Sequence, residues 1–162
     1  MSSAVIALRP ARLADVSAIH ALLREQAAAG NLLPRTQENL VRHVRDFVVA
    51  ERDGQVAAVG ALEIMGPDLG EVRSLAVAPA FHRQGIGEQV TRALLDQARS
   101  LGLRRVMVLT YVPAFFARLG FEVVSKDTLP EKVWQVCVKC YKFNRCDEIA
   151  MMCSLQPAID AG

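Results

Sequence analysis

The chain has 162 residues, of which 52% are hydrophobic and 22% charged, with a formal net charge of +2. This composition predicts a packed core, and the length is typical of one domain, here taken as residues 1–162. Dispersed charges of both signs argue against a nucleic-acid-binding surface.

Membrane insertion and export are also disfavoured. No stretch approaches the roughly 18 apolar residues that a membrane-spanning helix needs. The segment Met1–Leu8 has no positive charges ahead of an apolar run, unlike a secretory signal. These features predict a cytoplasmic protein.

The first third of the chain is predicted to form a strand and two helices. Val5–Arg9 is a short apolar strand that Pro10 stops. Apolar residues then recur at helical spacing from Leu13 and end near Gly30, a suitable helix stop. A second short helix is expected to begin at Thr36.

The middle of the chain is rich in predicted strands. Asp46–Glu51 and Gln55–Ile64 flank Arg52-Asp53-Gly54, a strong hairpin signal. A turn at Gly66-Pro67-Asp68 leads to a third strand, Glu71–Val77. Short turns between successive strands predict an antiparallel meander.

The second half alternates between helices and strands. A long amphipathic helix follows Gly85 and Gly87 and ends at Gly102, and a short helix ends at Gly120. The predicted strands here are Val106–Leu109, Phe121–Val124 and Ile149–Cys153, with a further helix around Val133–Val136. The sequence therefore predicts a mixed α/β fold with an antiparallel middle.

The segment Leu75–Gly87 carries the clearest functional signal. It reads as a strand end, a turn and two glycines that open a helix. Unpaired N–H groups and the positive end of the dipole make such a helix start a binding site for phosphate. Glycines at 85 and 87 allow the backbone to approach a pyrophosphate closely. The spacing matches neither G-x-x-x-x-G-K-[ST] nor G-x-G-x-x-G, and a helix start without any ligand is the alternative.

This segment resembles the acyl-CoA-binding motif of the GNAT superfamily of N-acetyltransferases, Gln/Arg-x-x-Gly-x-Gly/Ala, with His82 in the Gln/Arg place. The predicted element order over the whole chain is also similar to that fold, a mixed, largely antiparallel sheet flanked by helices. The resemblance implies acetyl-CoA as co-substrate. It places the pantetheine arm on the backbone of Leu75, Ala76 and Val77. The pyrophosphate would lie on Arg83, Gln84, Gly85, Ile86, Gly87 and Glu88.

Four phrases resemble a narrower family, the short N-acetylglutamate synthases of bacterial arginine biosynthesis. They are Leu33–Arg35, Glu71–Val77, Leu109–Phe116 and the tail Cys137–Glu148. The resemblance implies acetyl transfer to the α-amine of L-glutamate in a ternary complex. Lys126–Asp147 then becomes a family-specific insertion before the last strand.

Two charged residues of the third strand are the first candidates for catalysis and amine binding. Strand alternation puts Glu71, Arg73, Leu75 and Val77 on one face. The resemblance makes Glu71 the general base, with Glu63 as a rival. The guanidinium of Arg73 suits a carboxylate of the substrate. An ion pair between Arg73 and either glutamate is the structural alternative.

The remaining candidates lie elsewhere in the chain. Arg35 and Lys126 are candidates for the second carboxylate of the substrate. Many family members have a general-acid tyrosine where this chain has Phe116. Tyr111 or water is then expected to protonate the thiolate.

All four cysteines lie near the end of the chain. Cys137, Cys140, Cys146 and Cys153 have a spacing that zinc could use. A redox pair and ordinary buried thiols are the alternatives. We expect no metal in the reaction.

Other functions fit the same motif. One alternative is a family member that acts on another amine, such as a protein N-terminus or a polyamine. A polyamine site would need an acidic lining, whereas the candidates here are mainly arginine and lysine. A second alternative is an acyl-CoA sensor without turnover. Family members often dimerise, so the resemblance allows a homodimer, although the sequence does not reveal the oligomeric state.

Overall fold

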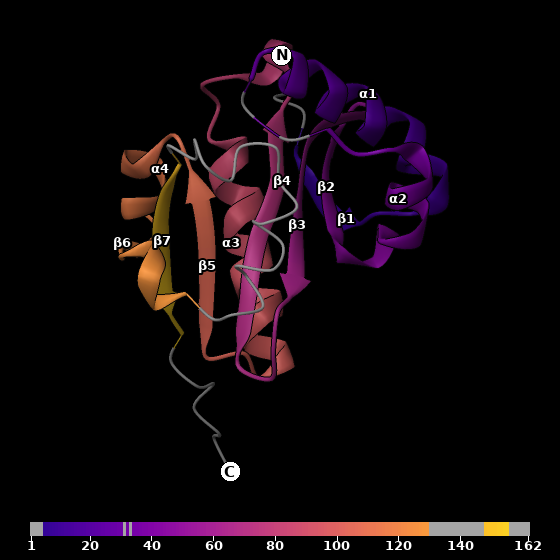
Figure 1. Ribbon diagram of the computed structural model, residues 1–162. Helices are drawn as coiled ribbons and strands as arrows, with labels where there is room; N and C mark the ends of the chain where they lie inside the picture. Colours follow the sequence, from indigo (N-terminus) through magenta and orange to yellow (C-terminus); the bar gives the residue numbers. More distant parts are fainter. Residues whose placement is uncertain (1–4, 31, 33, 130–147, 156–162) are drawn as a thin grey trace. The chain divides into compact units, whose positions relative to one another are not determined.

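The computed structural model describes residues 5–30, 32, 34–129 and 148–155 (Figure 1). Contacts divide the chain into two units. The first unit comprises Met1–Glu63 and Val72–Gln97, and the second comprises Ile64–Glu71 and Ala98–Gly162. The strand β4 (Leu69–Val77) contributes residues to both units.

In the first unit, three strands pair antiparallel in chain order. They are β1 (Ala7–Pro10), β2 (Phe47–Arg52) and β3 (Gln55–Ile64). The turn between β2 and β3 has two left-handed residues, Asp53 with φ +52° and Gly54 with φ +76°. Such a pair matches the twist of the flanking strands, which explains the tight hairpin.

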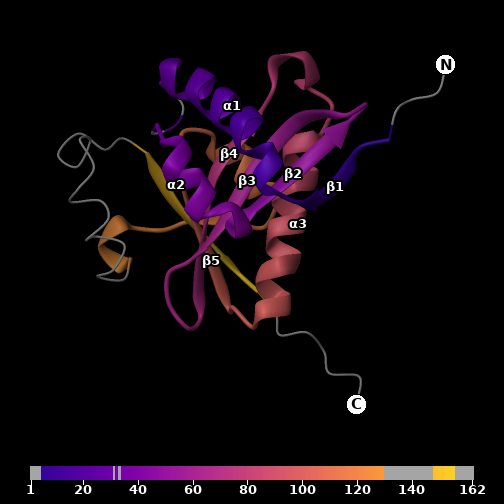
Figure 2. The same ribbon diagram turned by 90° about the vertical axis from the view of Figure 1, so that its right-hand side faces the viewer.

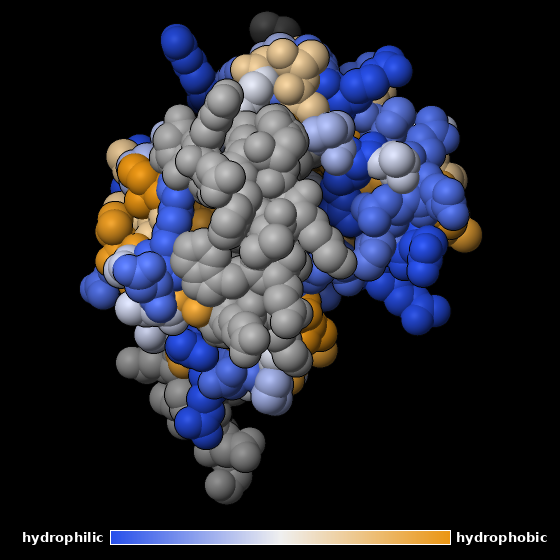
Figure 3. Space-filling model, viewed as in Figure 1, coloured by the Kyte–Doolittle hydropathy of each residue, from blue (hydrophilic) through white to orange (hydrophobic). Residues whose placement is uncertain are grey.

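Helices cover both faces of these strands (Figure 2). The 3₁₀ helix η1 (Leu13–Asp15), α1 (Val16–Ala28) and α2 (Gln37–Arg42) lie on one face. Thr36 caps α2 through a hydrogen bond from the backbone N–H of Asn39 to its hydroxyl, 3.0 Å long. The outer surface over α1 and α2 is mainly hydrophilic in Figure 3, as expected for amphipathic helices.

The buried side chains under α1 and α2 form one hydrophobic cluster. It consists of Val16, Ile19, Leu22, Leu23, Leu40, Phe47, Val49, Val59, Ala61 and Ala76. The opposite face packs against α3 (Ile86–Leu101). A Cβ atom on Gly60 would lie 2.9 Å from the Val90 side chain, so a larger residue at 60 would push α3 away from β3.

The second unit holds the rest of the sheet. The start of β4 pairs in parallel with β5 (Arg105–Thr110) from Leu69↔Arg105 to Glu71↔Met107. The last strand, β7 (Ile149–Ser154), pairs antiparallel with both β5 and the two-residue β6 (Glu122–Val123). The strand order of the sheet is therefore β1-β2-β3-β4-β5-β7-β6.

Two short helices complete the second unit. They are α4 (Pro113–Ala117) and the 3₁₀ helix η4 (Lys126–Thr128). In the first unit, the 3₁₀ helix η3 (Pro79–Phe81) follows β4. A further 3₁₀ helix, η2 (Val44–Asp46), precedes β2. No helix within the described ranges is long and apolar enough to cross a membrane.

The predicted elements agree with the structure to within a few residues, and the mixed α/β architecture is confirmed. The insertion of β7 between β5 and β6 is not visible in the sequence. The predicted helix around Val133–Val136 lies outside the described residues, as do Cys137, Cys140 and Cys146. A single domain over residues 1–162 stays a prediction.

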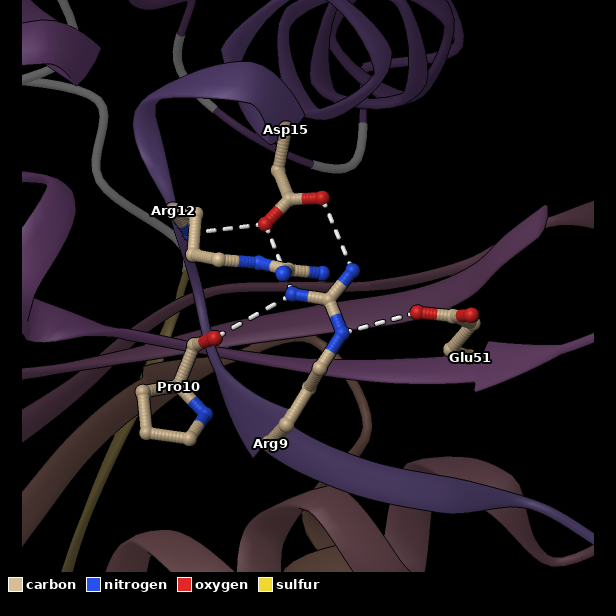
Figure 4. A network of polar contacts seen from close by, with 5 residues as sticks. All are labelled: Arg9, Pro10, Arg12, Asp15 and Glu51. Atoms are coloured by element: carbon tan, nitrogen blue, oxygen red, sulfur yellow. Dashed lines mark hydrogen bonds and ion pairs between the residues drawn. The ribbon is translucent and has the colours of Figure 1, made fainter. Parts of the chain in front are cut away.

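A network of ion pairs fixes the first strand (Figure 4). Two N–H groups of Arg9 donate to the carboxylate of Asp15, at 2.8 and 2.9 Å, and a third donates to Glu51 at 2.7 Å. Asp15 also accepts from the backbone N–H of Arg12. Its side chain is 10% exposed, so the network joins β1, η1 and β2 through a nearly buried carboxylate.

We expect Asp15→Asn to lower the free energy of unfolding by about 1.5–3 kcal/mol at pH 7, the usual contribution of hydrogen bonds to charged groups. The hydrogen bonds from Arg9 lower the pKa of Asp15 in the folded state. The stabilisation is therefore full above the unfolded pKa of about 3.9 and disappears as the pH falls through the lower, folded value.

Urea unfolding of both proteins from pH 7 to pH 2.5 tests this expectation. The control is Asp53→Asn, which changes an exposed carboxylate in a turn that suits asparagine. A stability difference for Asp15→Asn that is constant with pH would contradict the account.

Candidate active site

The central feature of the first unit is a break in β4 at Ser74. This residue has a φ of +55°, in the left-handed region that residues other than glycine rarely adopt. On one side of the break, Arg73 forms an ion pair with Glu63 of β3. On the other side, the Leu75 side chain lies on the face of the sheet that packs against α3. A Cβ atom on Gly60 would lie 3.3 Å from Leu75, next to Val90 and Leu94 of α3.

The break reverses the alternation of side chains along β4. Arg73 is paired with Glu63, which alternation along β3 puts on the α1 side with Ala61. A regular strand would return Leu75 to that side, yet Ala76 joins the hydrophobic cluster there instead. The prediction that Glu71, Arg73, Leu75 and Val77 share one face is therefore wrong beyond Arg73, because Ser74 acts as a β-bulge.

The half-buried side chain of Arg35 contacts Ser74. Arg35 donates a hydrogen bond to the Ser74 hydroxyl, 3.1 Å long, and another to the side-chain oxygen of Asn39, 2.7 Å long. Its guanidinium carbon lies 5.0 Å from the centre of the Phe47 ring. Three of its five N–H groups have no acceptor within the part of the chain that the structure describes.

Charged groups of both signs surround Arg35. Burial lowers its pKa, and the neighbouring charge of Arg73 lowers it further. The carboxylates of Glu63 and Asp46 act in the opposite direction. The guanidinium stays protonated, and its remaining N–H groups can donate to a carboxylate group.

Asp46 is a titratable member of this cluster that sequence reasoning missed. Burial raises its pKa, and a contact of 3.4 Å with the imidazole of His43 partly offsets that rise. Asn39 and Ser74 were missed as well. Asp46 directly precedes an apolar strand and Asn39 lies one turn after Arg35, but neither pattern marks a site by itself.

The predicted phosphate loop lies at the start of α3. Two of its residues are left-handed, Arg83 with φ +65° and Gly85 with φ +75°. A Cβ on Gly85 would meet nothing within 4 Å, so the space in front of this backbone is open. Ile86 anchors the helix start because its side chain is buried. The conformation fits a cradle for a pyrophosphate.

The other candidates belong to the second unit. Glu71 is 7% exposed and is the last β4 residue of the parallel ladder with β5. Tyr111 directly follows β5 and is 38% exposed. Lys126 begins η4. Phe116 is buried edge-to-face against Phe115 and Phe121, so it is a packing residue.

The candidates are divided between the two units. Arg35 and Arg73 lie together in the first unit, which also contains Leu75–Val77 and Arg83–Glu88. Glu71, Tyr111 and Lys126 belong to the second unit. Within the described ranges, no group of three or more His, Cys, Asp or Glu residues could hold a metal ion. Burial raises the pKa of the Cys153 thiol.

A model of the acetyltransferase (GNAT) family matches residues 16–121. The chain belongs to this family. The matched segment includes α1, the strands β2 to β5, and the loop before α3. The expectations of a GNAT fold, an N-acetyltransferase and acetyl-CoA as co-substrate are confirmed.

Two relatives match most of this chain and differ in how specific their names are. An uncharacterized N-acetyltransferase of Chlorobaculum tepidum is 40% identical over 159 residues, which cover 96% of this chain and 100% of that protein. An amino-acid acetyltransferase of Mycobacterium tuberculosis is 39% identical over 137 residues, covering 83% of this chain and 78% of the relative.

Among solved structures, N-acetylglutamate synthase from Neisseria gonorrhoeae, complexed with coenzyme A and N-acetyl-glutamate, is similar to this chain. The TM-score is 0.86 at 31% identity, over 96% of this chain and 36% of the synthase. The chain thus spans little more than a third of that protein.

We expect Ser74→Val to be less stable than Ser74→Gly by about 1–3 kcal/mol, because a β-branched side chain strongly disfavours the left-handed region. Thermal unfolding of the two variants measures the difference. Gln55, an exposed residue of β3, provides the control. There the valine variant should be more stable than the glycine variant. Valine as stable as glycine at 74 would mean that β4 is regular there.

Proposed function

We propose that this chain transfers the acetyl group of acetyl-CoA to the α-amine of a small amino acid, with L-glutamate as the first candidate. The amine attacks the thioester directly in a ternary complex, so that a C–N bond forms and the C–S bond breaks. The amine loses a proton to a base, and the CoA thiolate gains one. The product would be the first intermediate of arginine biosynthesis, made in the cytoplasm where acetyl-CoA is available.

The cluster around Arg35 is the observation that carries this proposal. Its guanidinium is half-buried beside Arg73 and retains N–H groups without an acceptor in the described chain. A carboxylate of a substrate could accept paired hydrogen bonds from these N–H groups. Glu63 and Asp46 lie in the same cluster and favour an ammonium group nearby. A zwitterionic amino acid supplies both charges, whereas a polyamine supplies only positive ones.

The similarity to relatives points in the same direction. The Mycobacterium tuberculosis relative is named an amino-acid acetyltransferase, and the Neisseria synthase was solved with N-acetyl-glutamate. For a glutamate acceptor we assign one carboxylate to Arg35 and Arg73. Lys126 is our candidate for the other.

We assign the co-substrate to the backbone on either side of the turn after β4. Leu75, Ala76 and Val77 are the last residues of β4 and directly follow the left-handed Ser74, and we assign the pantetheine arm and the thioester to their peptide groups. The open, left-handed loop and helix start at Arg83–Glu88 suit the pyrophosphate. Acetyl-CoA, when bound, supplies the activated carbonyl.

Glu71 and Tyr111 complete the proposed chemistry. Glu71 is 7% exposed and lies two residues before Arg73 on β4, and we assign it the role of general base, directly or through water. Tyr111, or water, would return a proton to the thiolate. Because Phe116 has no hydroxyl, this step requires a donor other than the usual tyrosine.

The experiment that tests the function is a thiol-release assay with acetyl-CoA and each amino acid, a tetrapeptide with a free N-terminus, and spermidine. We expect release with L-glutamate above all others. Arg35→Gln should raise the KM of the amino acid by roughly tenfold or more and affect that of acetyl-CoA much less. Release only with the peptide or spermidine, or with no acceptor while CoA still binds, would overturn the proposal.

Glu71→Gln tests the general base. Because the amide cannot take a proton, kcat should fall by about 10²–10⁴ and the acidic limb of the pH–rate profile should disappear. Glu63→Gln is the matched control, since it changes the rival carboxylate in the same way. An unchanged acidic limb in Glu71→Gln, or its loss in Glu63→Gln instead, would contradict the assignment.

A further inference from the structure

Two side-chain hydrogen bonds connect the loop between β4 and α3 to the neighbouring strands. His82 donates a hydrogen bond from Nε2 to the carbonyl oxygen of Val77, 2.8 Å long, which ties the loop back to the end of β4. Arg52 donates from Nη1 to the side-chain oxygen of Gln84, 2.6 Å long. The four residues that make these two contacts all belong to the first unit.

Arg52 contacts the loop twice. It is the last residue of β2, where the tight hairpin turn begins. Besides its bond to Gln84, its guanidinium carbon lies 5.9 Å from the centre of the Phe81 ring. One side chain therefore reaches both the end of η3 and the residue before Gly85.

The segment between these contacts needs such support. Residues 82–85 are exposed, and Arg83 and Gly85 both adopt left-handed conformations. An exposed loop of this kind loses conformational entropy when a ligand orders it. Contacts that set its shape beforehand reduce that loss and so increase affinity for the ligand.

We propose that Arg52 is a positioning residue for the nucleotide end of acyl-CoA. It holds Phe81 and Gln84 so that the backbone of the loop keeps the shape of a phosphate cradle, and it adds a permanent positive charge beside that cradle. This role rests on the placement of the pyrophosphate at Arg83–Glu88 proposed above.

The geometry also explains why this position suits arginine. The planar guanidinium can lie against the Phe81 ring and still donate a directed hydrogen bond to Gln84. Lysine would keep the charge, but its compact ammonium group does not provide the planar contact together with a fixed donor direction.

The test compares two acetyl donors in Arg52→Gln. Acetyl-CoA carries the phosphates, whereas acetylpantetheine has the same thioester without them. We expect the KM of acetyl-CoA and the Kd of CoA to rise about 3–10-fold, with kcat and the kcat/KM of acetylpantetheine unchanged. For Arg52→Lys, the KM of acetyl-CoA and the Kd of CoA should lie between those of the wild type and those of Arg52→Gln. A role in general folding would affect both donors equally.

Two further variants keep the result interpretable. Arg24→Gln removes the same charge from the exposed side of α1 and should change neither donor. Gln84→Ala removes the acceptor without altering the hairpin and should weaken CoA binding, with less than additive effect when combined with Arg52→Gln. If Arg52→Gln fails to fold, the Kd of CoA for Gln84→Ala decides, and an unchanged value overturns the role.

The test of Arg52 can be distinguished from a test of the proposed phosphate cradle itself, which uses Gly87→Glu. An unchanged Kd of CoA in Gly87→Glu would show that the pyrophosphate lies elsewhere. A weakened Gly87→Glu together with an unchanged Arg52→Gln, or equal losses for both acetyl donors in Arg52→Gln, would remove the role of Arg52 alone.

Discussion

The left-handed conformation of Ser74, held by Arg35, is the constraint on which the candidate site depends. A serine in the middle of a strand gains nothing locally from a φ of +55°. The hydrogen bond from Arg35 and the pairing of Arg73 with Glu63 stabilise it from outside. The strand continues beyond it to Val77, with Ala76 in the cluster on the α1 side.

Two halves of the proposed reaction follow from that one distortion. On the α1 side it brings polar side chains at 73 and 74 next to each other, beside Arg35 and Asp46. Beyond it, the end of β4 leads into the loop that Arg52 and His82 hold before α3. The proposed amine site and the proposed phosphate cradle thus both involve residues of β4 and the turn that follows it.

The sequence predicted the elements well, because periodicity, hairpin signals and glycine stops are local properties. It predicted the loop and the helix start at Gly85 and Ile86 for the same reason, whereas phosphate binding there stays a prediction. It could not predict the break at Ser74, since serine carries no intrinsic preference for a left-handed conformation and the stabilising Arg35 is 39 residues away. The error about Leu75 and Val77 follows from that one residue. The position of β7 and the role of Arg52 also depend on non-local contacts.

A crystal structure with CoA and N-acetyl-glutamate bound tests the central claim most directly. The account predicts a carboxylate of the ligand within hydrogen-bonding distance of Arg35, with Ser74 still left-handed. It also predicts pantetheine along the backbone of Leu75–Val77 and the pyrophosphate on the amides of Arg83–Glu88. A ligand carboxylate bound away from Arg35, or a Ser74 that returns to extended geometry, would contradict it.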